Sequence, residues 1–197
     1  MTTYIKILLS IAVASLLPLA AFSQGNKPRN FTDNGKKFTY TDSGGVTASY
    51  IAHFGDKFSV DSFSTPGGLI LTLSAQRQVV VYNFWFVACK PCVAEIPALN
   101  KLVDKYKNDS VQFIAITFDK EERVSNFLKT HPFNFMIGIL PVQSINLIKK
   151  IAFYPFTAIV NKNQKLTFVL TGRKTGKDPG KEIFEVLDPQ IRKALQQ

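Results

Sequence analysis

One stretch decides the fold: Val79-Val80-Val81-Tyr82-Asn83-Phe84-Trp85-Phe86-Val87-Ala88-Cys89-Lys90-Pro91-Cys92. Its first six residues are nearly continuously apolar, as expected of a central strand that is buried on both faces. Its last four contain both cysteines of the chain. A helix that begins here would bring the two thiols together, and the free N–H groups of its first turn would stabilise a thiolate. The stretch therefore indicates a strand that delivers a redox-active thiol pair to the start of a helix.

The amino-terminal segment is typical of a secretory signal. Lys6 precedes an apolar run from Ile7 to Phe22, and a small-residue site follows before Gln24. We expect cleavage there and a periplasmic or otherwise exported protein, whose cysteines can form a disulfide. The alternative is a membrane tether by an uncleaved anchor. That run, however, is shorter than the ~20 residues of a spanning helix and contains Pro18.

The rest of the chain is long enough for one domain with a sizeable core. We expect a signal peptide at 1–23, an amino-terminal extension at 24–54 and one α/β domain at 55–197. The formal charge is +10 for the whole chain. Because lysines and arginines are scattered without a long run, we interpret them as solvated surface and expect no nucleic-acid partner.

The residues after the cysteines predict a β-α-β unit. Apolar residues recur at helical spacing as far as about Lys107, and Pro97 should kink this helix. The apolar run 111–116 predicts a second buried strand, parallel to the first. The cysteines would then lie at the carboxyl end of a strand, where open α/β sheets place their sites.

Asp119 with Glu122 resembles a capping box that opens a helix, which His131-Pro132 would end. Patterns elsewhere predict further elements. In chain order these are an irregular segment before Thr47, a β-hairpin of 57–63 and 69–73 packed ahead of the main sheet, a helix at 145–152, an antiparallel hairpin of 156–160 and 165–170, and a final helix that begins at Asp178-Pro179 and is interrupted by Pro189.

The order of elements and the motifs together resemble the thioredoxin fold, in particular the exported TlpA/ResA-like thiol-disulfide oxidoreductases and their redoxin or AhpC/TSA relatives. The resemblance covers about Gly55 to Leu187. It implies a three-layer α/β fold with a central mixed β-sheet flanked by helices, an N-terminal β-hairpin and a helical insertion before a cis-proline loop. Four segments carry it: 83–92 as the strand leading to the active site, 92–97 with Glu95 and Pro97 at the family's offsets, 119–153 as the insertion, and Tyr154-Pro155 as the cis-proline loop.

Three positions depart from the family's pattern. Ala88 precedes the first cysteine, where many relatives have tryptophan, and the turn 161–164 lacks the usual glycine. Asn83 stands where thioredoxin has a buried aspartate. The last departure leaves Glu95 as the better candidate for handling protons.

We expect thiolate exchange at the cysteine pair. Cys89, at the exposed helix start, would attack a partner disulfide, and the more buried Cys92 would resolve the mixed disulfide. Glu95 would exchange protons with Cys92 if it is partly buried; the alternative is an ordinary helix-surface glutamate. The candidate substrate-binding residues are Trp85 as a packing wall, Lys90 as a positive charge or merely a solvated side chain, Pro91 as a stiffener of the turn, and Tyr154 and Pro155 as the loop that pairs with an extended polypeptide.

We expect no cofactor and no metal. Structural zinc requires four ligands, and only His53 and His131 accompany the cysteines. Covalent haem attachment needs histidine after the second cysteine, where Val93 stands. Two alternatives to an oxidoreductase stay open: a non-enzymatic binding module with a structural disulfide, and a peroxiredoxin-like peroxidase.

The sequence does not give the direction of electron flow. Pro91 before the second cysteine, as in reducing thioredoxins, favours a reductase of protein disulfides. The resemblance implies protein disulfide or thiol substrates, a membrane electron donor, and a role in cytochrome c maturation or cell redox homeostasis. We expect the protein to be a monomer.

Overall fold

A computed structural model describes residues 38–41, 47–50, 57–58, 60–73, 77–141, 154–171 and 179–197, together with Gly55 and Ser144. The signal-like segment, the helix predicted at 145–152 and the predicted cap Asp178 lie outside the described residues. Within the described ranges, no helix combines the length and the apolar character needed to cross a membrane.

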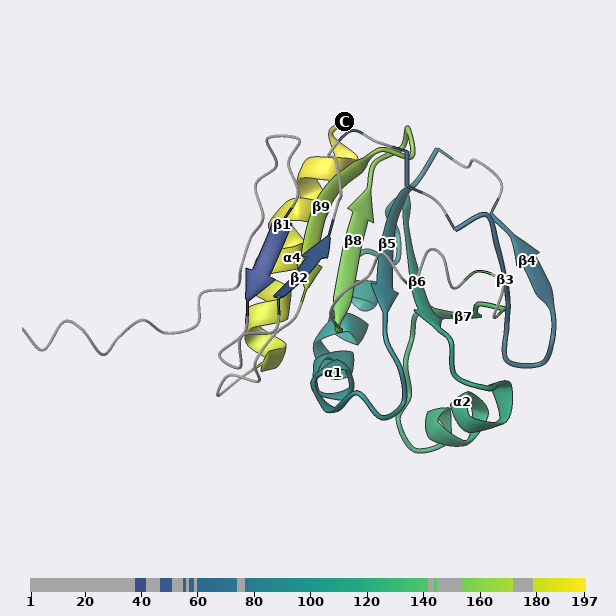
Figure 1. Cartoon of the computed structure of the whole chain (residues 1–197). Coiled ribbons are helices and arrows are strands. Elements are labelled where there is room, and N and C mark those ends of the chain that lie inside the picture. Colours follow the sequence, from purple (N-terminus) through teal and green to yellow (C-terminus); the bar gives the residue numbers. More distant parts are fainter. Residues whose placement is uncertain are drawn as a thin grey trace, which may run out of the picture.

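The main sheet has seven strands and is mixed (Figure 1). β5, β6 and β7 run parallel to one another, whereas the other neighbours pair antiparallel. The predicted central mixed sheet is therefore confirmed. In spatial order the strands are β4 (Ile70–Thr72), β3 (Ser62–Ser64), β7 (Met136–Ile139), β6 (Val111–Thr117), β5 (Val79–Phe84), β8 (Phe156–Val160) and β9 (Leu166–Thr171).

β5 is the central strand that the apolar run predicts. Val79 and Val81 belong to the buried core on one face of the sheet, whereas Tyr82 and Phe84 belong to the core on the other face. Because side chains alternate along a strand and both faces are covered, every position of β5 favours an apolar residue. Asn83 is the polar exception, and it lies on the same face as Val81.

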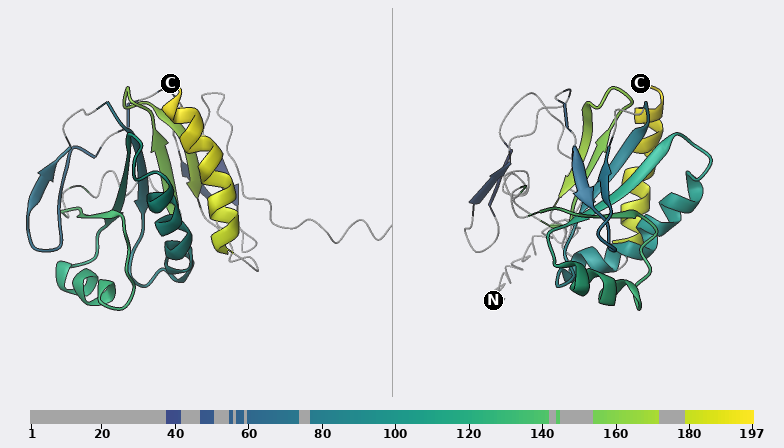
Figure 2. Two further views of the ribbon diagram at one scale, coloured as in Figure 1. Left: turned by 180° about the vertical axis from the view of Figure 1, so that it is seen from behind. Right: turned by 90° about the vertical axis from the view of Figure 1, so that its right-hand side faces the viewer.

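The described helices are α1 (Lys90–Lys105), α2 (Glu121–Leu128) and α4 (Pro179–Leu195). Seen from behind, α1 and α4 cover the same face of the sheet (Figure 2). Buried residues of both helices share one core with Val79 and Val81. The predicted interruption of the final helix is wrong, because α4 continues through Pro189.

A buried polar cluster joins the far end of α1 to α4. The Tyr106 hydroxyl donates to Oδ1 of Asp188 at 2.8 Å and to its backbone oxygen at 3.1 Å. Lys105 and Arg192 form ion pairs with the same carboxylate. Burial alone would raise the pKa of Asp188, but the hydrogen bonds from Lys105 and Tyr106 outweigh it and hold the pKa below its usual 3.8. Burial and the bond to Asp188 also raise the pKa of Tyr106.

Two predictions about the first part of the chain need correction. The segment before Thr47 is not wholly irregular, because β1 (Phe38–Thr41) pairs antiparallel with β2 (Thr47–Tyr50) in a separate two-stranded sheet. The predicted hairpin is present, because β3 pairs antiparallel with β4, but it forms the edge of the main sheet, since Ser64 pairs with Ile139 of β7. β7 supplies an open backbone edge there, and pairing with it satisfies donors and acceptors that would otherwise be left unpaired.

The segment predicted as a helical insertion holds a strand as well as a helix. β7 lies within it and pairs parallel to β6. Gly138 of β7 has no room for a side chain, because a Cβ there would lie 2.6 Å from Cδ1 of Ile116 and 2.8 Å from the Phe63 ring. The insertion therefore extends the main sheet towards the β3–β4 hairpin.

Candidate active site

The two cysteines lie where β5 gives way to α1, as the sequence predicts. They form a disulfide with a Cα–Cα distance of 5.3 Å. Cys89 is the N-cap of α1, and its Sγ accepts a hydrogen bond from the backbone N–H of Cys92 at 3.3 Å. In the reduced protein the same N–H group and the helix dipole would stabilise a Cys89 thiolate.

Cys89 is less accessible than the sequence predicts. It is only 5% exposed, against 3% for Cys92, so the expected contrast between an exposed and a buried cysteine is wrong for this disulfide form. The reason is that the N-cap position turns the side chain back over the first turn, where both cysteines join the core beneath α1. The two cysteines therefore differ in helix position, N-cap against first turn, and hardly in exposure.

The Tyr154-Pro155 peptide bond is cis, as predicted. Pro155 is buried and directly precedes β8, whose first residue, Phe156, pairs with Phe84 at the end of β5. The cis-proline loop and the cysteine loop are therefore neighbours at one edge of the sheet. Burial raises the pKa of the Tyr154 phenol to about 12, so its hydroxyl stays neutral across physiological pH.

Glu95 lies inside the protein, so the alternative of an ordinary surface glutamate is wrong. It is 1% exposed and stands three residues after Cys92 on α1. Burial disfavours the charged form of a carboxyl group. Asn83, also buried, donates from Nδ2 to Oγ1 of Thr157 at 3.1 Å. An amide does not titrate, which leaves Glu95 as the ionisable side chain of the two.

The other predicted residues differ in accessibility. Lys90 is exposed and Pro91 is half-buried. Trp85 is 1% exposed and packs against the rings of Phe127 and Phe133, with centroid distances of 5.3 and 5.6 Å. Its burial fits a packing wall rather than a surface that touches a partner.

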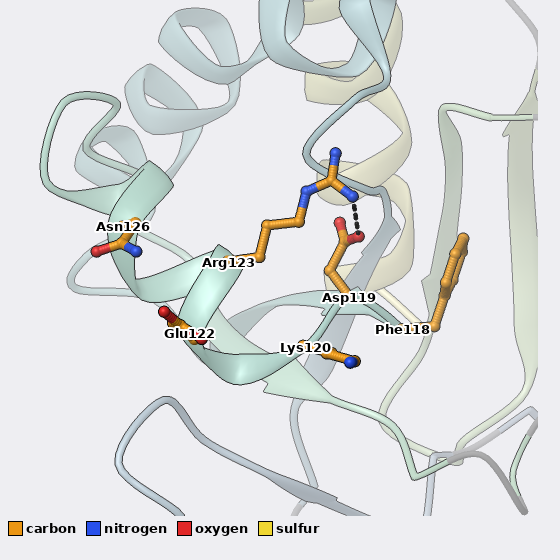
Figure 3. A pocket seen from close by; sticks show the side chains of 6 residues that line it. All are labelled: Phe118, Asp119, Lys120, Glu122, Arg123 and Asn126. Atoms are coloured by element: carbon orange, nitrogen blue, oxygen red, sulfur yellow. Dashed lines mark ion pairs between the residues drawn. The ribbon is translucent and has the colours of Figure 1, made fainter.

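The predicted capping box is wrong, and Asp119 makes a different contact. α2 begins at Glu121 after Lys120, with no side-chain cap. Oδ2 of Asp119 accepts instead from the backbone N–H of Val87 at 2.6 Å, and Oδ1 lies 3.5 Å from Arg123 Nη1 (Figure 3). Asp119 therefore ties the loop after β6 to the loop that carries Cys89.

Sequence reasoning also missed two aromatic residues at this edge. Phe86 and Phe118 contact each other and Tyr154, beside the cysteine loop and the cis-proline loop. A signal for them existed, because Phe86 and Phe118 each stand two residues after a predicted strand, 79–84 and 111–116 respectively. The carboxyl ends of neighbouring parallel strands meet at one edge, so both residues belong beside the cysteines.

The redoxin family profile matches residues 32–187 of the chain. This chain belongs to the redoxin family. The predicted relationship to TlpA/ResA-like proteins is confirmed by this match together with the relatives and structures described next.

This redoxin is similar in sequence to proteins named thiol-disulfide oxidoreductase ResA. It is 33% identical over 97 residues to ResA of Bacillus cereus, which covers 49% of this chain and 56% of that protein. It is 29% identical over 139 residues to ResA of Geobacillus kaustophilus, which covers 66% of this chain and 80% of that protein. The chain thus spans little more than half the length of the Bacillus cereus relative.

Two solved structures share the fold of this redoxin. One, from Chlorobium tepidum and assigned as the thiol:disulfide interchange protein DsbE, has a TM-score of 0.62 and 28% identity and covers 72% of this chain and 97% of its own. The other, from Bacteroides thetaiotaomicron and assigned as a protein disulfide isomerase, has a TM-score of 0.63 and 23% identity. It covers 75% of this chain and 93% of its own. The thioredoxin-like α/β fold is confirmed.

Proposed function

We propose that this redoxin is a thiol-disulfide oxidoreductase that reduces disulfides of polypeptides through Cys89 and Cys92. One observation carries the proposal: the two cysteines form a disulfide at the N-terminus of α1, next to a cis-proline loop. A bridge across so short a loop removes little conformational entropy from the unfolded chain, so stabilisation is a poor reason for its presence.

The reaction begins from the reduced protein. The Cys89 thiolate attacks one sulfur of the partner disulfide, which forms a mixed disulfide and releases the partner's other sulfur as a thiolate. Cys92 then attacks Sγ of Cys89, which restores the internal disulfide and releases the partner's second thiol. The partner gains two electrons and the protein loses two. A thiol or dithiol donor must supply them before the next cycle.

The neighbours of the cysteines have separate roles in this scheme. Glu95, buried three residues after Cys92, accepts the proton of that thiol as it becomes a nucleophile. Pro91 stiffens the turn, and Lys90 adds positive charge near Cys89. Pro155 is expected to lie against the sulfurs, where the backbone of Tyr154 would pair with an extended partner segment. Trp85 supports the site from beneath.

The setting of the reaction belongs to the proposal as well. Residues 1–23 direct export and are removed, 24–54 form an extension, and 55–197 form the redox domain. A membrane donor recycles the disulfide, and the monomeric protein serves oxidised cysteines outside the cytoplasm, as in cytochrome c maturation. Support for export comes from the pattern of the amino-terminal segment, and the resemblance to the exported TlpA/ResA-like proteins supports the rest.

Single cysteine variants test the chemistry. We expect Cys89→Ser to abolish disulfide reduction and Cys92→Ser to accumulate a mixed disulfide with the partner, visible by mass spectrometry. Full activity in both variants would refute the mechanism.

Equilibration in thiol buffers tests the direction of electron flow. A reduction potential near ~−270 mV or lower supports a reductase, whereas one near ~−120 mV indicates an oxidant. A disulfide that does not cycle at all would favour the non-enzymatic binding module.

A further inference from the structure

We infer that Phe86, Phe118 and Tyr154 form an aromatic platform that selects polypeptide substrates with a large apolar side chain next to their disulfide. The inference rests on the proposed function and names the substrate class of the same site.

The three rings of the aromatic platform lie in mutual contact. Ring centroids are 5.3 Å apart for Phe86 and Tyr154, 5.7 Å for Phe86 and Phe118, and 5.9 Å for Phe118 and Tyr154. Each ring comes from a different loop: Phe86 stands between β5 and α1, Phe118 follows β6, and Tyr154 is the residue of the cis-proline bond. The platform therefore borders both loops that a reacting polypeptide must touch.

Phe118 is the open part of the platform. It is 46% exposed, although aromatic side chains of this size are usually buried. The other exposed large apolar side chains among the described residues lie elsewhere: Leu69 and Ile70 on the β3–β4 hairpin, and Met136 at the start of β7. Scattered apolar residues need no explanation, but contiguous rings beside a reactive group mark a binding surface.

The contact between Asp119 and Val87 holds the platform in place. Asp119 directly follows Phe118, and its carboxylate accepts the Val87 N–H from the loop that carries Phe86. Asp119 also donates its own N–H to the buried Thr117 hydroxyl at 3.2 Å. Both loops are thus fixed relative to each other before a partner arrives, which lowers the entropy cost of binding.

The charges around Phe118 do not favour partner segments of either charge. Phe118 lines a surface hollow together with Asp119, Lys120, Glu122, Arg123 and Asn126 (Figure 3). Two of these side chains are positive and two are negative, and Arg123 already pairs with Asp119. A partner segment of either charge would therefore meet a balanced surface. The aromatic ring is left as the group that discriminates between partners.

The occupant of the platform follows from the chemistry of the site. A partner sulfur must reach Sγ of Cys89, so the residues that flank this sulfur pass over the loops on either side of it. An apolar flanking side chain would cover the exposed face of Phe118 and remove it from water. A polar flanking side chain would either leave the face of Phe118 exposed to water or lose its own hydrogen bonds to water.

Two synthetic peptides test the platform. Each carries an intramolecular disulfide, and they differ only in the residue next to the first cysteine, Phe in one and Ser in the other. The mature protein is reduced and mixed with excess peptide, and its remaining thiols are alkylated and counted by mass over time. We expect the wild-type protein to reduce the Phe peptide about tenfold faster, the scale of one aromatic contact.

The variants Phe118→Ser and Ile70→Ser complete the experiment. In Phe118→Ser we expect the rate ratio of the two peptides to fall to about one. Ile70→Ser removes an even more exposed apolar side chain, 72% exposed, from the β3–β4 hairpin, which contributes no ring to the platform, and should keep the wild-type ratio. Because the two rates in each variant are compared with each other, a general loss of activity cannot imitate the effect.

The outcomes separate the platform from the proposed function. Reduction of neither peptide by the wild-type protein overturns the proposed reductase, and the platform with it. Equal rates for the two peptides, or a ratio that persists in Phe118→Ser, overturns the platform alone. A ratio lost equally in Ile70→Ser also overturns it.

Discussion

Neutralising Asp188 should loosen the attachment of α1, the helix that carries the cysteines, to α4. The variant Asp188→Asn keeps the size of the side chain but removes its charge. The Tyr106 hydroxyl would then donate to a neutral amide, and a hydrogen bond to a charged group contributes roughly 1 kcal/mol more than a neutral one. Lys105 and Arg192 are 40% and 56% exposed at the side chain, so each ion pair adds only about 0.2–1 kcal/mol. The expected loss of unfolding free energy is about 2 kcal/mol.

The loss should depend on pH with a definite sign. The pKa of Asp188 is lower in the folded protein than its usual 3.8, because the hydrogen bonds from Lys105 and Tyr106 outweigh burial. Its contribution to stability is therefore fully present above about pH 4 and is lost as the pH falls through the folded pKa. The unfolding free energy of the wild-type protein should exceed that of Asp188→Asn by the same margin at pH 5 and pH 7. At pH 3 the margin should be smaller.

Urea unfolding at these three pH values measures the margin. Asp104→Asn is the matched control, since it neutralises an exposed carboxylate on α1, next to Lys105, and should change stability by less than about 0.5 kcal/mol. Equal stability of Asp188→Asn and the wild-type protein at pH 7 would refute the reasoning. So would a margin that does not shrink at pH 3.

Three further predictions concern the site and the sheet. Glu95→Gln should slow the release of the mixed disulfide and remove one inflection from its pH–rate profile, because a buried amide cannot take the proton of Cys92; superimposable profiles would contradict a role in proton transfer. Pro155→Thr should keep the fold by circular dichroism but prolong mixed disulfides, and unchanged lifetimes on non-reducing gels would argue against contact of Pro155 with the sulfurs. Gly138→Ala should lower the unfolding free energy by about 1–3 kcal/mol in urea, because its Cβ would lie 2.6 Å from Ile116; a variant as stable as the wild-type protein would show that β7 can shift to make room.

The elements that the sequence predicts best are those whose signal is local. Strand β5 has the bounds of its apolar run, and α1 begins at the cysteines, because burial on both faces or on one stripe fixes the residue types there. The β8–β9 hairpin also agrees, and its turn closes without glycine because Gln164 itself adopts a φ of 60°. In that turn, Oδ1 of Asn161 accepts the backbone N–H groups of Asn163 and Lys165.

What the sequence does not predict depends on contacts between distant segments. Asp119 matches the sequence pattern of a helix cap, but its carboxylate instead accepts a hydrogen bond from the Val87 N–H, 32 residues away. The short strand β7 has too few residues for a clear period and is stabilised by pairing with β6 and β3. No pattern links Tyr106 to Asp188 across 82 residues. The burial of Cys89 likewise follows from the packing of α1 and not from its residue type.

Trp85 gives the protein an optical reporter of its own chemistry. It is the only tryptophan of the chain, and its indole N–H is buried without a hydrogen-bond partner in the described part of the structure. An indole in such dry surroundings emits at short wavelength. Trp85 shares one buried cluster with Cys89 and Cys92, and a nearby disulfide quenches indole fluorescence. Reduction of the pair should therefore increase the fluorescence intensity of Trp85. Each half-reaction can then be followed in real time on the unlabelled protein.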